Sequence, residues 1–328
     1  MLPSPIHPSL RRRWWLATAC LLLLGSGCGS DAGKLSGAAS EPAASVRQLA
    51  VYLEQGDLAG FARAAVPPAQ HAQLAQSWAD GDSLWPLTGL PLDEHLPDLL
   101  ATLADPDAER NLHRAFQAQL AGQGANVRQT AHSLGLFGAQ YVGHQGDYSD
   151  AQRAHYRQLV LGLSRWASQA PLSDPALAQQ SISALTEAVR ASGLDGAQAL
   201  QAAGMEPALQ RLGPVQQALV LMLDGYGLGL AQSLQALQVG LVSQDGDSAV
   251  VQVQYPLAGQ TVEFQAALER HEGTWYMSQN LADAQQVLAA ASQARALREQ
   301  AAAAQQAADG TTIAGDEPNT DDKTAAGP

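Results

Sequence analysis

The chain has 328 residues and a formal net charge of −13, with 18 Lys and Arg against 31 Asp and Glu. A nucleic-acid binder needs clustered cations to displace counterions from phosphate, so we expect no nucleic-acid partner. The two cysteines, Cys20 and Cys28, both stand near the start. The chain after Cys28 therefore has no disulfide, no cysteine nucleophile and no thiolate metal site.

Residues 1–27 have the pattern of a secretory signal. Arg11, Arg12 and Arg13 precede an apolar run of 11 residues, from Trp14 to Leu24. A membrane-spanning helix needs about 20 apolar residues, so this run predicts a cleaved signal rather than a span. The three arginines also loosely resemble a twin-arginine export signal, although Leu10 stands where Ser or Thr is usual. That export route is the alternative.

The signal ends in Gly25-Ser26-Gly27-Cys28, which resembles the lipobox of bacterial lipoproteins, with Gly25 where Leu is usual. The resemblance implies cleavage before Cys28, acylation of that cysteine with chains such as palmitate, and attachment to a lipid membrane. Gly29, where Asp would imply retention at the inner membrane, implies an outer-membrane lipoprotein facing the periplasm. Cleavage would also remove three arginines and no acid, which takes the net charge to −16. Ordinary signal cleavage beside an incidental cysteine is the alternative.

Composition divides the rest of the chain into three parts. Residues 28–43 are small and polar, which predicts a flexible tether. Residues 44–308 are predicted to form the folded domain. Residues 309–328 are acidic and nearly free of large apolar side chains, which predicts a disordered tail.

Helical signals fill residues 44 to about 236. Ser45-x-x-Gln48 and Ser149-x-x-Gln152 are capping-box patterns, Asp57 and Asp174-Pro175 predict helix starts, and Gly56 and Gly193 predict helix ends. Pro214 is predicted to start a helix, and its apolar segment at 218–223 is expected to be central and buried. Residues 281–308 predict a long final helix.

Residues 236–278 alternate apolar and polar side chains with a period of two, which predicts strands with one buried face. Asp245-Gly246, Gly259 and Glu272-Gly273 predict the turns between them. The predicted fold class is therefore α+β: a long all-helical N-terminal part, then a four-stranded antiparallel meander and a C-terminal helix.

The segments DGDSAVVQV and EGTWYMS in this block resemble the nuclear transport factor 2-like, or cystatin-like, superfamily, in the style of small lipoproteins of unknown function. The resemblance covers about 45 residues and implies a sheet whose concave face can hold a pocket. Thr274 stands where a Lys is usual.

Chemistry-bearing residues are sparse. Tyr255 is the one ionisable group expected on the buried sheet face, while Glu263 and Glu269 are expected on the wet face, so we predict no catalytic residues. The histidines show no metal-ligand spacing, which predicts no metal site and no cofactor. The loop at 141–150 gathers His144, Asp147 and Tyr148, which with Tyr255 form a speculative pocket.

Two functions compete on these grounds. The first is an envelope-anchored, non-catalytic module that binds or scaffolds an unidentified envelope protein. The alternative is a binding protein or enzyme for a small apolar ligand, with a pocket between sheet and helices.

Overall fold

The computed structural model describes residues 41–89, 95–144 and 149–313. The predicted signal, the predicted lipidation site at Cys28, the tether as far as residue 40 and residues 314–328 of the predicted tail lie outside these ranges. The described chain is mostly helical, with one four-stranded antiparallel meander followed by a C-terminal helix, so the predicted fold class is confirmed.

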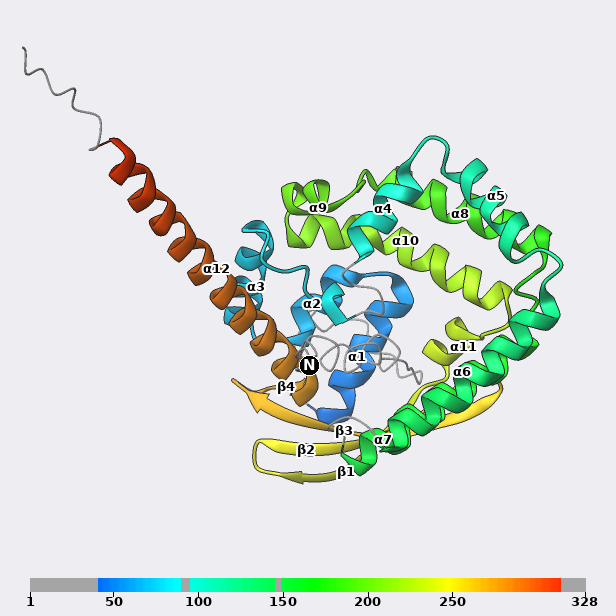
Figure 1. The fold of residues 1–328 in the computed structure, drawn as a ribbon. Helices are drawn as coiled ribbons and strands as arrows, with labels where there is room; N and C mark the ends of the chain where they lie inside the picture. The colour runs from blue at the N-terminus through cyan, green and yellow to red at the C-terminus, as the bar shows by residue number, and fades with distance from the viewer. Residues whose placement is uncertain (1–40, 90–94, 145–148, 314–328) are drawn as a thin grey trace, which may run out of the picture.

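Eleven helices precede the sheet in the described ranges (Figure 1). They are α1 (Pro42–Gln55), α2 (Leu58–Ala65), α3 (Pro68–Ala79), α4 (Leu96–Ala104), α5 (Ala108–Gln119), α6 (Gly124–His144), α7 (Asp150–Gln169), α8 (Pro175–Ser192), α9 (Ala197–Ala203), α10 (Met205–Gly225) and α11 (Leu230–Gln235), with a short 3₁₀ turn at Leu87–Gly89. None of the described helices is both long and apolar enough to cross a membrane.

Helix ends follow the local signals in most places. Ser149 accepts a hydrogen bond from the Gln152 backbone N–H, and the Gln152 side chain accepts one from the Ser149 N–H, which completes the predicted capping box. Asp174 caps α8 through the N–H groups of Ala176 and Leu177. Gly56 ends α1 with a φ of 70°, a left-handed conformation that glycine adopts without steric cost.

Two predicted helix starts are wrong. Ser45 does not cap α1, because the helix begins a turn earlier with Pro42 as its first residue, and the Ser45 hydroxyl donates to the Pro42 carbonyl. Pro214 lies inside α10, which begins at Met205. Burial of Met205, Ala208, Leu209 and Leu212 along one stripe of α10 outweighs the local cost of an internal proline.

The apolar segment 218–223 is not the buried centre of the fold. None of its six residues is fully buried, and Leu221 is 71% exposed. The buried residues of α10 all lie in its first half, from Met205 to Gly213, and the helix packs on α2 and α8. An all-apolar segment predicts partners on every side, but this one has partners on only part of its surface.

The sheet consists of β1 (Gln238–Asp245), β2 (Ser248–Leu257), β3 (Gln260–His271) and β4 (Thr274–Met277), hydrogen-bonded in that order. The last two turns, Ala258-Gly259 and Glu272-Gly273, have positive φ at both residues, as a type I′ hairpin turn requires. In the β2–β3 pair, Val253 lies opposite Phe264 and Tyr255 opposite Val262. These side chains therefore share one face.

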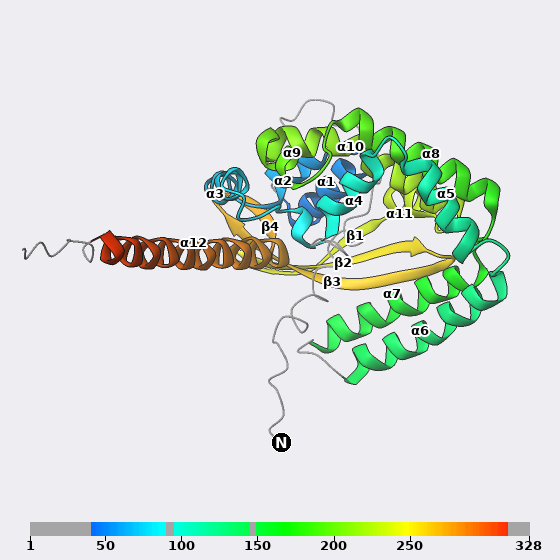
Figure 2. The same cartoon turned by 45° about the horizontal axis from the view of Figure 1, so that its top comes forward.

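The helices α1, α2 and α11 pack against the sheet, and the core lies between them. Trp78 and Trp275 are among its largest fully buried side chains, and the Trp78 ring N–H donates to the Leu200 carbonyl at 2.9 Å. In Figure 2 the hairpin of α6 and α7 lies on the opposite side of β2 and β3 from α8 and α10. The last helix, α12 (Ser278–Ile313), projects from the body (Figures 1 and 2) and extends five residues beyond the predicted end at 308.

Candidate functional site

The covered face of the sheet holds Tyr255, the first of the predicted pocket residues. Its side chain is 1% exposed, and Val251, Val253 and Trp275 around the same face are equally buried. The Tyr255 hydroxyl has no hydrogen-bond partner among the described residues, and burial raises the pKa of this phenol well above its ordinary value. The face is therefore packed by helices rather than open to solvent.

A buried histidine that we did not predict as a site residue from the sequence packs beside Tyr255. His155 of α7 stacks on Phe264 with ring centroids 4.4 Å apart, and Phe264 meets Tyr255 edge-on at 6.4 Å. Burial lowers the pKa of His155 to about 4, so the imidazole is neutral at pH 7. Within the described ranges its Nε2 atom has no hydrogen-bond partner. The rings of His155, Phe264 and Tyr255 therefore pack on one another. The Tyr255 hydroxyl oxygen and the His155 Nε2 atom are the two polar atoms of this cluster that have no hydrogen-bond partner in the described ranges.

This cluster does not have the chemistry of an acid–base pair. The tyrosine holds its proton and the histidine stays neutral over the physiological range. No hydrogen bond joins a carboxylate to either group in the described part of the chain. General acid–base catalysis needs a group that changes protonation near the working pH.

The other predicted pocket residues lie elsewhere. His144 is the exposed last residue of α6, while Asp147 and Tyr148 fall outside the described residues. His144 and Tyr255 therefore line no common surface, because one is exposed and the other is buried. Across the described ranges, no three His, Cys, Asp or Glu side chains lie close enough together to hold a metal ion.

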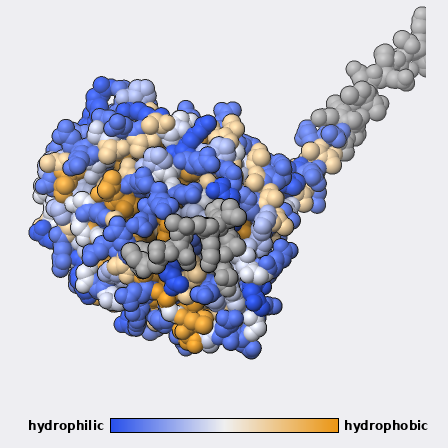
Figure 3. Space-filling model, turned by 180° about the vertical axis from the view of Figure 1, so that it is seen from behind, coloured by the Kyte–Doolittle hydropathy of each residue, from blue (hydrophilic) through white to orange (hydrophobic). Residues whose placement is uncertain are grey.

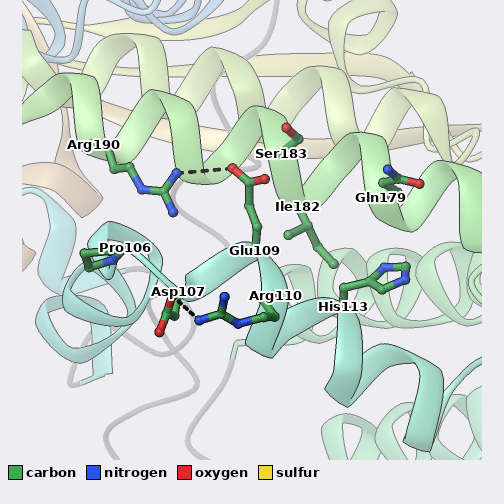
Figure 4. Close-up of a pocket in the computed structure, with 9 residues that line it drawn as sticks. All are labelled: Pro106, Asp107, Glu109, Arg110, His113, Gln179, Ile182, Ser183 and Arg190. Carbon is green, nitrogen blue, oxygen red and sulfur yellow. Dashed lines mark hydrogen bonds and ion pairs between the residues drawn. The ribbon is translucent and has the colours of Figure 1, made fainter.

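A cleft of about 490 Å³ opens between α5 and α8 (Figure 4). Arg190 donates to the Glu109 carboxylate at 3.2 Å and to the Asp105 carbonyl at 2.9 Å. Glu109 also accepts from the Thr186 hydroxyl at 3.1 Å. The cleft is lined by Pro106, Asp107, Glu109, Arg110, His113, Gln179, Ile182, Ser183 and Arg190.

The charges in this cleft already pair with one another. Arg110 forms an ion pair with Asp107, and Figure 4 shows both ion pairs beside each other with His113 toward the other end. Both arginines that line the cleft therefore already have a carboxylate partner. The cleft offers hydrogen-bonding groups but no nucleophile held by a base.

The segment Asp80-Gly81-Asp82 holds the middle of α12. Arg295 lies 2.7 Å from Asp80 and 3.0 Å from Asp82, and Arg298 pairs with Asp82 as well. The Asp82 side chain is only 1% exposed. Two turns of α12 are therefore held at one point on the body.

Around these ion pairs and beyond them, α12 is exposed to solvent. Every described side chain from 292 to 306 is exposed, and Leu297 is 65% exposed. Figure 3 shows the helix as a rod that projects from a largely hydrophilic surface with scattered apolar patches.

Comparison with known proteins adds no assignment: no family model, no curated protein and no solved structure matches this chain. The resemblances to the lipobox and to the nuclear transport factor 2-like superfamily therefore remain predictions from sequence.

Proposed function

We propose that this chain is a lipid-anchored, non-catalytic protein-interaction or scaffold module of a bacterial cell envelope. Acylated Cys28 would hold it in the membrane, most simply the outer membrane, with the folded domain in the periplasm. The short apolar run before Cys28, the small residues that follow it and the tether support the anchor.

The single observation that carries the interaction function is the exposed half of α12. Most helical stability in proteins comes from packing against other elements, so a partner that packs against this exposed part of α12 would stabilise it. Its side chains are mostly Ala and Gln, which allow close approach of another helix, and Leu297 gives it one large apolar contact. A helix that is tied to the body near its middle by Asp82, and exposed there and beyond, can present this surface to an envelope protein.

The alternative is small-molecule binding. An apolar ligand between sheet and helices would require the packed side chains around Tyr255 to separate, because they are 0–1% exposed. The cleft between α5 and α8 suits a small polar ligand better, since Arg190 and His113 both line it. Native mass spectrometry of the purified protein tests this alternative directly.

The interaction function is tested by a photoreactive side chain at Leu297, with the same probe at Leu221 as the matched control. Both leucines are exposed, but Leu221 lies on α10. We expect irradiation of cells to link the Leu297 probe to one recurrent envelope protein that the Leu221 probe does not capture. Equal and unspecific products from both positions would argue against α12 as the binding element.

A further inference from the structure

The exposed apolar side chains of this protein are concentrated on the α6–α7 hairpin. Of eleven large apolar side chains that are exposed in the described ranges, four lie on these two helices. Leu134 and Phe137 of α6 are 63% and 64% exposed. Single exposed leucines are ordinary, but a cluster on one element indicates a contact surface. The four are Leu134, Leu136, Phe137 and Leu161.

The same hairpin is basic in an acidic protein. The described residues of α6 and α7 carry four arginines and one acid, a formal charge of +3 in a chain of −13. The acid is Asp150, and the arginines are Arg128, Arg153, Arg157 and Arg165. Arg153 donates to the Val142 carbonyl and Arg165 to the Gln260 side chain, so the exposed Arg128 and Arg157 are the arginines on which docking depends. A surface that combines arginines with leucine and phenylalanine complements an anionic lipid surface.

The hairpin is held rigidly, so its outer side is a defined surface. Gln158 of α7 both accepts from the Glu263 N–H at 3.0 Å and donates to the Glu263 carbonyl at 3.1 Å, which occupies the edge of β3 as a neighbouring strand would. A Cβ added to Gly135 would come closer than 3.0 Å to Ser164, so α6 packs closely on α7. Through α7, the sheet thus fixes the position of α6.

We propose that the outer side of α6 and α7 docks on the anionic headgroups of a lipid bilayer, with the exposed leucines and Phe137 entering the interface. This inference rests on the proposed anchor at Cys28. A tether from Cys28 to Glu41 spans at most about 50 Å, so the domain stays near the membrane that holds it.

The distribution of charge decides which side of the domain faces the membrane, and it favours a lipid surface as the partner of the α6–α7 hairpin. The rest of the domain is strongly acidic and is repelled by an anionic surface, so the hairpin is the element that can approach it closely. Each arginine near such a surface strengthens docking by about fivefold.

The test uses the mature lipidated protein with an environment-sensitive fluorophore on Leu136→Cys, in vesicles that contain a lipid-borne quencher. The matched control carries the fluorophore on Leu221→Cys, on the far side of the molecule's sheet. Vesicles of phosphatidylcholine alone are compared with vesicles that also contain phosphatidylglycerol. We expect quenching at position 136 in anionic vesicles only, and Arg128→Gln with Arg157→Gln to weaken this docking by about 25-fold.

This experiment distinguishes failure of the proposed anchor at Cys28 from failure of the proposed docking surface on α6 and α7. Flotation with phosphatidylcholine vesicles reports the anchor, and a protein that does not float contradicts the lipidation of Cys28. Quenching at position 136 that is no greater than at position 221 in anionic vesicles overturns the docking surface, whatever the anchor does. A photoreactive side chain at Leu136 that captures an acidic protein in cells, together with no quenching at position 136 in anionic vesicles, overturns it too and assigns the surface to a protein partner.

Discussion

Gly213→Ala tests whether α10 and the end of α1 are as close as the structure shows. A Cβ on Gly213 would come closer than 3.0 Å to the carbonyl oxygen of Gly56, which is backbone and cannot rotate away. Gly56 is itself the left-handed residue that ends α1, with its N–H bonded to the Leu53 carbonyl. The new methyl group therefore forces the end of one helix away from the other.

The expected effect is a loss of stability. Overpacking a tight site costs about 1–3 kcal/mol, and the better helix propensity of alanine returns at most about 1 kcal/mol. We expect Gly213→Ala to lower the free energy of unfolding by about 1–2 kcal/mol. Urea denaturation followed by far-ultraviolet circular dichroism measures this difference.

Gly225→Ala is the matched control, because it changes the same residue type in the same helix. A Cβ on Gly225 has no atom within 4 Å in the described structure. This variant should be as stable as the wild type or slightly more stable. If Gly213→Ala proved equally harmless, the close approach of α10 to Gly56 would be wrong.

Three further predictions concern charge. Asp82→Asn weakens the hold on Arg295, so amide hydrogen exchange in the first turns beyond that arginine should be faster. Burial raises the pKa of Asp283 to about 6 despite an opposing hydrogen bond from Gln279. Because the folded protein then holds this proton more tightly than the unfolded chain does, the wild type loses stability as the pH rises from about 4 to 6. Asp283→Asn should then be more stable at pH 7.5 by about 1–3 kcal/mol, a difference that closes near pH 4. The lowered pKa of His155 has the opposite sign: the unfolded chain binds the proton first, so stability is lost as the pH falls from 6.5 to 4, and His155→Phe should remove this dependence.

Each of these predictions has a distinct contrary result. Unchanged exchange rates in Asp82→Asn would mean that its ion pairs do not hold α12. A stability gain in Asp283→Asn that was the same at pH 4 and pH 7.5 would exclude a raised pKa as its cause. If His155→Phe kept the acid sensitivity of the wild type, another group would be responsible for it.

The meander was predictable because each of its signals is local. In β2 and β3 the period-two alternation fixes which side chains share a face, and the glycines at 246, 259 and 273 supply the positive φ of the turns. The buried face predicted for β1 is wrong, because Leu241 and Val242 of this edge strand are 53% and 51% exposed. Ser149-Gln152 and Asp174-Pro175 were predictable for the same reason, since a cap depends only on residues within one turn.

The errors arose where tertiary packing decides. The stripe that starts at Met205 makes one helix through Pro214, and no local pattern shows that Gly56 lies against Gly213. The segment 218–223 looked central because all its side chains are apolar, yet burial depends on how many neighbours reach it.

Among the site residues too, those that depend on a local pattern were predictable, and those that depend on distant contacts were not. Tyr255 was placed correctly on the buried sheet face by alternation alone. His155 was missed because its contact with Phe264 joins residues 109 positions apart, and no sequence spacing encodes that. The two hydrogen bonds from the Gln158 side chain of α7 to the Glu263 backbone of β3 could not be predicted from the sequence for the same reason. Leu134 and Phe137, three residues apart on one helix, were the available signal for the hairpin surface.

The most direct test of the central claim is crosslinking of the tagged, lipidated protein in its native envelope, followed by mass spectrometry, with Cys28→Ser as the control. We predict one reproducible envelope partner whose crosslink is lost or weakened when the anchor is removed. An abundant, correctly processed protein that yields no partner would contradict an interaction module.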